Sequence, residues 1–360
     1  MTRIRVPLGK FIKEYSERNK GNEDIPVYSV TNSQGFCTEY FGKEVASQDK
    51  TTYKIVPQGY FAYNPSRINV GSVDWQRYEK RVIVSPLYNV FSVSEGIDRQ
   101  YLYYFLRSDL GRQMIKAKAS GSVRDNLKLD MLKEMTIPDI SVEQQKFCSS
   151  VLDKLHKLIQ MRQQELQKLD EFIKARFIEL FGDPVSNPKD WDVVPLGKRC
   201  GIITGNTPSR SEPENYGEYI EWIKSDNINT PFTFITKAQE CLSEAGFDKC
   251  RFVEAGSILM TCIAGSINCI GNVAVTDRRV AFNQQINAIV PEQDEVLYLY
   301  WLMQLSKPMI HRTINMALKG ILSKSQLSEI AFPFPPITLQ EQFATFVEQT
   351  DKSKVAVRKY

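Results

Sequence analysis

Histidine is scarce in this 360-residue chain, which contains only His156 and His311. That scarcity removes most histidine-based metal sites and most Ser-His-Asp catalytic arrangements. The seven cysteines include no Cys-x-x-Cys pair, and the first residues lack the long apolar segment of a secretory signal. An odd number of cysteines without an export signal predicts reduced thiols in a cytoplasmic protein.

Long hydrophobic runs are also absent, since no stretch of about 20 apolar residues occurs, and we expect no membrane span. The composition, 42% hydrophobic and 24% charged, is that of an ordinary globular protein with enough apolar material for real cores. A length of 360 residues indicates two domains or three. The net charge of +4 permits nucleic-acid binding but does not by itself indicate it.

Motifs of catalysis are missing as well. The chain has no phosphate-binding loop, no Gly-x-Gly-x-x-Gly after a strand, no Gly-x-Ser-x-Gly and no His-Glu-x-x-His. Tyr63-Asn64-Pro65-Ser66 is similar to the Asn-Pro-Pro-aromatic tetrapeptide of DNA adenine methyltransferases, but the second proline and the aromatic residue are absent. We interpret it as a turn after a strand, and we predict no catalytic residue and no metal site in this chain.

One long helix is predicted from Ser141 to Phe181. Ser141 and Gln144 form a capping box at its start, and Gly182 followed by Pro184 ends it. Some 41 residues would make a rod of roughly 60 Å. Apolar residues alternate at steps of four and three, the rhythm of a helix that packs along its length against another helix. This seam contains Cys148, Leu152, Leu155, Ile159, Arg162, Leu166, Leu169, Ile173, Arg176 and Leu180.

The sequence on the two sides of this helix is a duplication. Val6-Pro7-Leu8-Gly9-Lys10 recurs letter for letter at 194–198. The offset grows from 188 residues at this pentapeptide to about 197 where Ile140 is matched with Ile337, which indicates a modest insertion in the second copy. Further matches, in the same order, are Arg81-Val82 with Arg279-Val280, Asn89 with Asn287, 101–104 with 298–301, and 127–138 with 322–333.

Each copy predicts the same series of elements. Short strands come first, then an apolar helix, a glycine-containing loop, a proline-marked strand and a capped helix. The expected strands include 59–63, 82–84, 256–260 and 287–290, and the expected apolar helices are 99–114 and 295–310.

The second capped helix is shorter than the first. We expect it from Thr338, capped by Glu341, to Tyr360, which is roughly 34 Å. If the two helices pair, nearly half of the first seam lacks a partner within the chain. A missing segment or another chain then covers its distal half, because that half is too apolar for a solvated linker. The predicted packing residues are Leu152, Leu155, Ile159, Leu166, Leu169, Ile173, Leu180, Phe343 and Phe346.

Polar and basic loops recur at matching places in the two copies. Arginine can bind guanine bidentately, asparagine can bind adenine, and hydroxyl groups can hold phosphates. A single such loop is commonly just solvated, but recurrence favours function. The candidate DNA contacts are Arg67, Asn69, Ser122, Arg124, Asn126, Thr207, Ser209, Arg210, Lys319 and Ser323.

The whole chain resembles the specificity subunits of type I restriction–modification systems. The resemblance rests on the order of several features and on the duplication, since no single feature is diagnostic. These features are Pro7-Leu8-Gly9, Pro195-Leu196-Gly197, the Pro- and Gln-containing helix starts at 138–145 and 333–342, 181–184 leading to Trp191, 205–209 and 220–223.

The resemblance implies an α+β fold with two similar α/β target-recognition domains joined by long helices that form an antiparallel coiled-coil spacer. The implied division is a first recognition domain (1–140), a long spacer helix (141–184), a second recognition domain (185–336) and a short second spacer helix (337–360). Each domain would bind one half of a bipartite target in double-stranded DNA, and the helices would set the gap between the halves.

The resemblance also implies that methyltransferase subunits dock on the helices, and that a restriction and motor subunit joins the complex indirectly. S-adenosylmethionine, ATP and magnesium would belong to those partners, with no cofactor on this chain and no role for a membrane. Self-association through the uncovered part of the long helix is a further expectation. The rival interpretation is a scaffold that assembles proteins through its coiled coil without binding DNA, and the modest charge favours it slightly.

Overall fold

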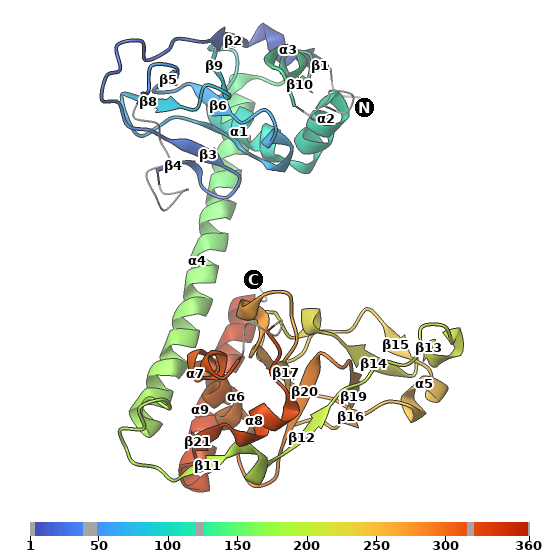
Figure 1. Cartoon of the computed structure of the whole chain (residues 1–360). Coiled ribbons are helices and arrows are strands. Elements are labelled where there is room, and N and C mark those ends of the chain that lie inside the picture. The colour runs from blue at the N-terminus through green and yellow to red at the C-terminus, as the bar shows by residue number, and fades with distance from the viewer. Residues whose placement is uncertain (1–3, 39–48, 120–125, 315–319, 359–360) are drawn as a thin grey trace. The chain divides into compact units, whose positions relative to one another are not determined.

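Two compact units make up the protein, and the boundary between them falls inside one long helix. The units are Met1–Ile159 and Gln160–Tyr360, and the helix is α4 (Val142–Phe181), drawn in green in Figure 1. Unit 1 combines antiparallel sheets with short helices, and unit 2 combines an antiparallel and a mixed sheet with short helices, so the fold class is α+β, as the sequence predicts. The computed structural model describes residues 4–38, 49–119, 126–314 and 320–358.

Unit 1 is built on a four-stranded antiparallel sheet in the order β2-β9-β6-β7. Strand β5 pairs with β8, β3 forms a hairpin with β4, and β1 pairs with β10. Phe61 and Phe91 stack face to face in its core at 5.0 Å between ring centroids. The elements are β1 (Arg5–Pro7), η1 (Leu8–Lys10), β2 (Ile12–Tyr15), β3 (Ser29–Thr31), β4 (Gly35–Cys37), β5 (Lys54–Pro57), β6 (Phe61–Tyr63), η2 (Ile68–Val70), β7 (Val73–Trp75), β8 (Arg81–Val84), β9 (Asn89–Val93), α1 (Arg99–Arg107), α2 (Asp109–Ala119), α3 (Leu129–Lys133) and β10 (Thr136–Pro138).

Unit 2 has the equivalent sheet in the order β12-β20-β17-β18, and β11 pairs with β21. A second sheet has the order β13-β15-β14-β19-β16, and its antiparallel pair of β16 with β19 repeats the pair of β5 with β8 in unit 1. The elements are β11 (Val193–Pro195), η3 (Leu196–Lys198), β12 (Cys200–Thr204), η4 (Pro213–Asn215), β13 (Tyr216–Gly217), β14 (Ile220–Ile223), η5 (Ser225–Asn227), β15 (Cys241–Leu242), α5 (Glu244–Asp248), β16 (Phe252–Val253), β17 (Ile258–Thr261), η6 (Ile267–Cys269), β18 (Val273–Val275), β19 (Val280–Phe282), β20 (Ile286–Pro291), α6 (Val296–Leu305), α7 (Lys307–Arg312), α8 (Lys324–Glu329), β21 (Ala331–Pro333) and α9 (Ile337–Arg358).

The opening pentapeptide closes each unit in the same way, which confirms the predicted duplication. The Leu8 amide donates to the Met135 carbonyl at 2.7 Å, and the Leu196 amide donates to the Ile330 carbonyl at 2.9 Å. In both copies the strand that carries the pentapeptide pairs antiparallel with the proline-marked strand before the capped helix. The first and last strands of each unit are therefore neighbours, and each unit is closed on itself.

The apolar helix predicted at 99–114 is in fact two helices, α1 and α2. Ser108 lies between them with extended backbone (ψ 160°), and its hydroxyl accepts from the Gly111 amide at 3.0 Å. Ser108 thus ends one helix and caps the next. Gly111 is required at this corner, because a Cβ there would overlap the Phe105 carbonyl oxygen. Periodicity continued through Ser108, so the prediction missed the break.

The helix predicted at 295–310 divides at the same place, into α6 and α7. Ser306 lies between the two helices, and Pro308 occupies the first turn of α7. Proline has no amide hydrogen to donate and is suited to the first turn of a helix. Both units therefore have the same break between the two helices.

A glutamine on each capped helix holds that helix to its own unit. The Asp98 amide donates to Gln145 Oε1 at 2.8 Å, and Gln145 Nε2 donates to the Ile140 carbonyl at 3.0 Å. Gln340 Oε1 accepts from the Glu295 amide at 3.0 Å, and its Nε2 donates to the carbonyl five residues earlier, that of Pro335, at 2.9 Å. Gln145 thus corresponds to Gln340.

The predicted match of Ile140 with Ile337 was consequently wrong by two residues, because the repeat keeps one offset through the proline-marked strands and into the helices. The predicted cap at Thr338 and Glu341 was also wrong, since α9 already begins at Ile337 and the amides of Leu339 and Gln340 donate to the Pro336 carbonyl.

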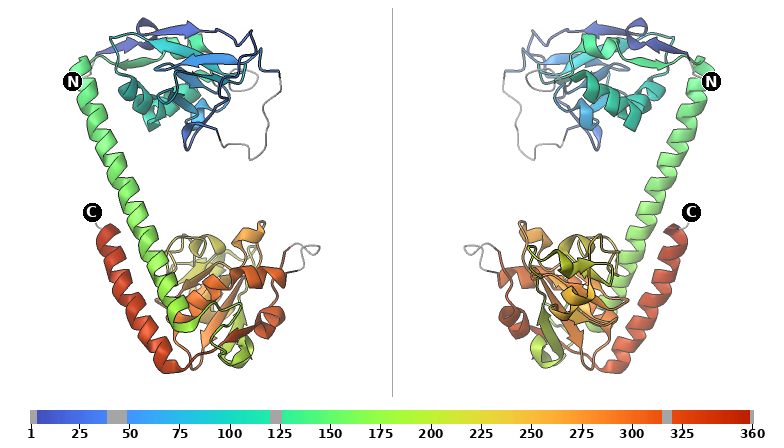
Figure 2. Two further views of the ribbon diagram at one scale, coloured as in Figure 1. Left: turned by 90° about the vertical axis from the view of Figure 1, so that its left-hand side faces the viewer. Right: turned by 90° about the vertical axis from the view of Figure 1, so that its right-hand side faces the viewer.

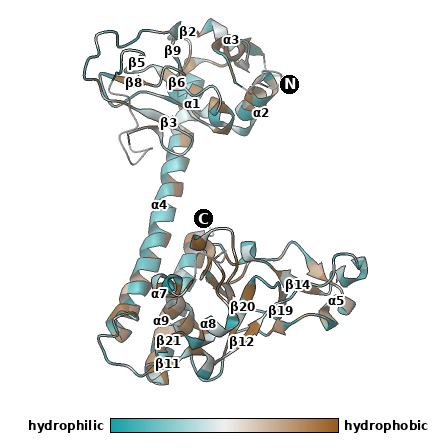
Figure 3. Cartoon of the chain, in the orientation of Figure 1, coloured by the Kyte–Doolittle hydropathy of each residue, from teal (hydrophilic) through white to brown (hydrophobic). Residues whose placement is uncertain are grey.

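Helix α4 begins and ends as predicted. The Ser141 amide donates to the Gln144 side chain at 3.2 Å, the Gln144 amide donates to Ser141 Oγ at 3.3 Å, and Gly182 adopts a positive φ of 80°. The seam residues in the first half of α4 are exposed, with exposed fractions of 39% for Leu152, 50% for Leu155 and 55% for Ile159. Figure 3 accordingly colours the middle of α4 largely hydrophilic, with a few hydrophobic patches.

The distal half of α4 is packed within unit 2, so the expectation that this half lacks a partner was wrong. Leu166, Leu169 and Leu180 are partly buried, and Ile173, Phe177 and Phe181 belong to the core of unit 2. Helix α9 lies beside this part of α4 in both views of Figure 2. The predicted interface therefore divides into a packed part on unit 2 and an exposed part around Leu155.

The ring and ion-pair contacts of α9 establish that it runs antiparallel to α4. Phe343 lies 5.4 Å from Phe177, whereas Phe346, one turn later, lies 5.0 Å from Phe172 (ring centroids). Lys354, near the end of α9, pairs with Asp170 at 2.7 Å. Rising numbers on α9 thus meet falling numbers on α4, as predicted for an antiparallel spacer.

Candidate nucleic-acid interface

The turn after β6 in unit 1 carries the first candidate residues. Asn64 Oδ1 accepts from the Ser66 amide at 3.1 Å and from Ser66 Oγ at 2.9 Å, which folds the chain back on itself. The predicted turn at the methyltransferase-like tetrapeptide is therefore correct. Arg67, which is exposed, then leads into η2 and places Asn69 in the middle of that short helix.

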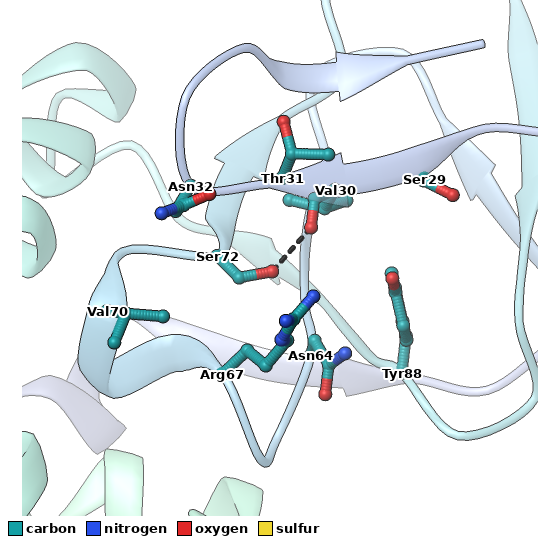
Figure 4. A pocket seen from close by; sticks show the side chains of 9 residues that line it. All are labelled: Ser29, Val30, Thr31, Asn32, Asn64, Arg67, Val70, Ser72 and Tyr88. Carbon is teal, nitrogen blue, oxygen red and sulfur yellow. Dashed lines mark hydrogen bonds between the residues drawn. The ribbon is translucent and has the colours of Figure 1, made fainter. Parts of the chain in front are cut away.

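A recess of about 60 Å³ lies between this turn and β3 (Figure 4). Ser72 closes one side, because its hydroxyl donates to the Val30 carbonyl, while the Arg67 side chain extends between Asn64 and Ser72. The recess is lined by Ser29, Val30, Thr31, Asn32, Asn64, Arg67, Val70, Ser72 and Tyr88, most of which are polar. Uncharged hydrogen-bonding groups beside one arginine suit the edges of bases or the sugar–phosphate backbone.

Arg107 fixes the two walls of this recess. It projects from the end of α1, where Nη1 donates to the Gly71 carbonyl at 2.9 Å and Nη2 to the Asn32 carbonyl at 2.6 Å. The guanidinium also lies 5.1 Å from the ring centroid of Tyr103. The turn after β6 and the tip of the β3–β4 hairpin are thus joined through one cation.

Asp74 holds the other strand of the same hairpin. Its Oδ2 accepts from the Phe36 amide at 3.0 Å, and Arg77 pairs with its Oδ1 at 3.1 Å. Burial raises the pKa of Asp74, while Arg77 and the amide donors oppose that rise. The hairpin is therefore held at its tip by Arg107 and in β4 by Asp74, both charged groups of the unit itself.

Residues Asn126 and Leu127, which follow the glycine-containing loop of copy one, lie beside the turn after β6. The Leu127 amide donates to the Pro65 carbonyl at 3.1 Å, which places the half-buried Asn126 next to this turn. Arg67, Asn69 and Asn126 are therefore gathered at one edge of unit 1. Ser122 and Arg124 lie outside the described residues.

Unit 2 repeats this arrangement after β17. The Leu322 amide donates to the Cys262 carbonyl at 3.0 Å, the counterpart of the bond between Leu127 and Pro65. Helix η6 follows as η2 does, and Asn268 occupies the middle position that Asn69 has in η2. A second recess, lined by Ile263, Ala264, Gly265, Ile267, Gln285, Gly320 and Ile321, lies beside this turn. Lys319 lies outside the described residues.

A lysine secures η6. Lys307, the first residue of α7, donates through Nζ to the Asn268 carbonyl at 2.6 Å and to Asn272 Oδ1. Burial lowers the pKa of Lys307 below its ordinary value. In each unit, a basic residue at the junction of the two helices thus holds the 3₁₀ turn.

Thr207 lies near the second recess. Its hydroxyl donates to Gln284 Oε1, and the carbonyl of the next residue, Gln285, accepts from the amides of Cys262 and Ile263. Ser209, two residues further along the loop, is exposed and shares a hydrogen bond of 2.7 Å with Ser211. Thr207 is therefore the member of this loop that is connected to the turn after β17.

Arg210 and Ser323 have strong partners within the chain. Arg210 binds both oxygens of Glu240, Nη2 to Oε2 at 3.0 Å, and lies 4.4 Å from the ring centroid of Tyr216. The hydrogen bonds from Arg210 are the main cause that lowers the pKa of Glu240. Ser323 caps α8 through a reciprocal pair with Gln326. Both contacts favour a structural role.

Asn268, Arg107 and Lys307 were not among the predicted site residues. The sequence did contain a signal for Asn268. The dipeptide Ile-Asn occurs at 68–69 and again at 267–268, and a glycine, Gly71 or Gly271, comes two or three residues after the asparagine and adopts a positive φ. The two dipeptides are not in register in the repeat, because more residues separate η6 from β17 than separate η2 from β6. The match was therefore not recognised from the sequence. The clamping residues gave no local signal, because their partners lie more than 30 residues away.

No metal-binding group of three or more histidine, cysteine, aspartate or glutamate side chains occurs among the residues that the structure describes. Within the same residues, no helix combines the length and the apolar character needed to cross a bilayer. All seven cysteines are free thiols.

Sequence comparison adds independent evidence. The family model described as type I restriction modification DNA specificity domain matches residues 9–171 and again 188–359. The HindI specificity subunit of Haemophilus influenzae is 35% identical over 117 residues, 31% of this chain and 24% of that protein. The MjaIX specificity subunit of Methanocaldococcus jannaschii is 30% identical over 176 residues, 46% of this chain and 38% of that protein. The matched segments thus span less than half of each of these relatives.

Solved structures share the fold. The S subunit of a type I restriction–modification system from M. genitalium aligns with a TM-score of 0.58 at 14% identity, over 100% of this chain and 92% of that one. A chain from a structural study of complex assembly in the type I R-M system aligns with a TM-score of 0.55 at 16% identity, over 99% and 92%. With two matches of the family model and the repeated fold, the chain belongs to the type I restriction–modification DNA specificity family.

Proposed function

We propose that this chain is the DNA-binding specificity subunit of a type I restriction–modification complex and that each unit binds one half of a bipartite target in double-stranded DNA. One observation carries the proposal. In both units a 3₁₀ helix follows the equivalent strand, and equivalent backbone hydrogen bonds from Leu127 and Leu322 are made to the turn that precedes it. Two copies of one binding element in one chain suit a target in two parts.

The chemistry of these edges supports DNA as the ligand. Arg67, Asn69 and Asn126 in unit 1, and Thr207 and Asn268 in unit 2, provide the donors and acceptors that match base edges and phosphates. Catalysis by this chain is not part of the proposal. Methyl transfer and DNA cleavage would belong to partner subunits, which would also hold S-adenosylmethionine, ATP and magnesium.

The exposed stretch of α4 around Leu155 supports a docking role for partners. Leu155, Leu158, Ile159 and Met161 are each at least half exposed, and exposed apolar side chains in a row are typical of protein interfaces. Methyltransferase subunits are the proposed occupants, and the restriction and motor subunit would join through them.

An exchange of units tests the proposal. Residues 1–140 would be replaced by those of a relative with a different target, and the complex with its methyltransferase would be expressed in cells. Mapping of methylated adenines should then reveal one altered half-site, with the other half-site and the gap unchanged. A change in both half-sites, or in neither, would contradict the assignment of one half-site to each unit.

A salt titration of DNA binding separates this function from the scaffold interpretation. Neutralisation of phosphates makes the logarithm of the affinity fall with the logarithm of the salt concentration, by about 0.9 per phosphate. We expect a steeper negative slope for the full chain in complex with its methyltransferase than for the methyltransferase alone, whereas a scaffold would leave the slope of the methyltransferase unchanged.

A further inference from the structure

The two basic residues that hold the 3₁₀ turns are equivalent in placement but different in kind. Arg107 is the last residue of α1 and Lys307 is the first residue of α7, so each lies at the junction of the helix pair in its unit. Arg107 donates to the Gly71 carbonyl at the end of η2, and Lys307 donates to the Asn268 carbonyl within η6. In each unit, therefore, a basic side chain from the junction of the helix pair holds the 3₁₀ turn.

Neither cation is arranged as a phosphate ligand. Lys307 is partly buried, its Nζ is bonded to a carbonyl and to Asn272 Oδ1, and Asn272 Nδ2 in turn donates to Asn229 Oδ1 at 2.7 Å. Arg107 donates to two carbonyls and lies against Tyr103. Their hydrogen-bonding capacity is directed into the protein, toward the backbone that carries Asn69 and Asn268.

The turns themselves favour a defined presentation of these asparagines. Each is a single 3₁₀ turn followed by a glycine with positive φ, 99° at Gly71 and 81° at Gly271, a conformation that other residues rarely adopt. Asn268 is exposed and Asn69 is partly exposed. A carboxamide held on a rigid turn can make the bidentate contact to adenine that a mobile side chain makes less specifically.

We propose that Asn69 and Asn268 are matched base-contacting residues, one in each unit, and that Arg107 and Lys307 are the positioning residues that hold them. The inference rests on the proposed function, since it names the residues by which each unit would bind its half-site. Asn268 and Lys307 serve the half-site of unit 2, whereas Asn69 and Arg107 serve that of unit 1.

The test uses the full chain in its complex with the methyltransferase, on the duplex target found by methylation mapping and on variants with single base-pair changes. Lys307→Met removes the charge and keeps most of the side-chain length. We expect discrimination among bases to fall roughly tenfold at one position of the unit 2 half-site. Discrimination at the unit 1 half-site and the salt slope should stay unchanged. Asn268→Ala should relax the same position, and Lys307→Arg should restore most of the discrimination.

Lys324→Met is the matched control, because Lys324 is an exposed lysine of the same unit at the start of α8.

A Lys307→Met variant that keeps full discrimination would overturn the inference and leave the proposed function intact. A salt slope smaller by about 0.9 with unaltered base preference would also overturn it, since it would make Lys307 a phosphate ligand. An equal loss at both half-sites with a lower Tm would identify a purely structural lysine. Absence of DNA binding by the unsubstituted chain would overturn both proposals.

Discussion

Ion pairs distinguish residues that hold unit 2 together from residues that are available to a ligand. Glu221 accepts from Arg278 through both oxygens, at 2.7 and 2.9 Å, and also from the Ala238 amide at 2.6 Å. The two arginine bonds join β14 to the loop before β19, and the Ala238 bond joins β14 to the loop before β15. Arg210 and Glu240 form a similar pair nearby, which is why we assign Arg210 to the structure of the unit.

We expect the stability that Glu221 contributes to depend on pH. The Arg278 hydrogen bonds hold the pKa of Glu221 below its ordinary value of 4.5. A carboxylate with a depressed pKa stabilises the folded state above the unfolded pKa, and this contribution is lost as the pH falls through the folded value. Glu221→Gln should therefore cost roughly 1.5 kcal/mol of unfolding free energy at pH 7, and progressively less as the pH falls below the ordinary pKa of the carboxyl group.

Urea denaturation at several pH values measures this effect. The control is Glu254→Gln, because Glu254 pairs with Arg279 at a site where both side chains are more than half exposed. Exposed pairs contribute little, so that variant should unfold like the unsubstituted chain. A cost for Glu221→Gln that is independent of pH would contradict the assignment of its stabilisation to the charged pair.

Sequence alone could not separate these structural residues from the binding candidates. Arg210 stands in a polar loop typical of nucleic-acid contacts, and only the fold brings Glu240, 30 residues later, into contact with it. Ser323 differs from Arg210, because its structural role has a local signal in the sequence. Gln326, three residues later, forms a capping box with Ser323, and this pattern predicts a helix start. Local chemistry was readable from the sequence, whereas pairing across the fold was not.

At the scale of elements, local signals were the reliable ones. The limits of α4 were predicted because a cap, a heptad rhythm and a terminal glycine all lie within the helix or next to it. The breaks at Ser108 and Ser306 were missed because the apolar pattern continues through them. The extent of α4 that packs on α9 could not be predicted, since it depends on where the core of unit 2 meets the helix.

The rings at the junction of α4 and α9 are expected to be a main source of stability for unit 2. Phe343 is fully buried and lies 5.4 Å from Phe177 and 5.5 Å from Phe181, between ring centroids. Phe343→Ala should cost about 3–5 kcal/mol, because it removes a large buried side chain and leaves a cavity. Tryptophan fluorescence during urea denaturation reports mainly on unit 2, since three of the four tryptophans (191, 222 and 301) lie there.

Phe172→Ala is the matched control on the same helix pair. Phe172 is 55% exposed and lies 5.0 Å from Phe346 (ring centroids), so its loss should cost less than about 1 kcal/mol. Equal costs for the two substitutions would indicate that α9 is held by its whole length and not by the Phe343 cluster.

At the scale of the whole molecule, the duplication was the most informative feature of the sequence. Identical pentapeptides predicted two related units, and the matching strand orders β2-β9-β6-β7 and β12-β20-β17-β18 confirm them. Strands β13 and β15 of unit 2 were not predicted, because the added length of this copy gave only a growing offset without a pattern of its own. The equivalence of Gln145 and Gln340 is established by their hydrogen bonds, because the sequences at the two helix starts can be aligned in more than one register.

If α4 sets the gap between the half-sites, its length should determine that gap. The stretch from Leu152 to Met161 is the place for a test, because its apolar side chains are exposed and Ile173, where the core of unit 2 begins, lies beyond it. Insertion of seven helix-forming residues there adds about 10.5 Å and turns the helix by only about 20° relative to its original register. We therefore expect the gap to grow by about three base pairs, while the bases recognised in each half-site stay the same.

Mapping of methylated adenines in cells that carry the lengthened chain with its methyltransferase measures this directly, since it reports both half-sites and the gap. Seven residues inserted at Glu218, in the exposed turn between β13 and β14 of unit 2, serve as a control that adds the same mass without lengthening α4. The gap should be unaltered in that control. An unchanged gap after insertion in α4, with methylation retained, would mean that the helix joins the units without measuring the distance between them.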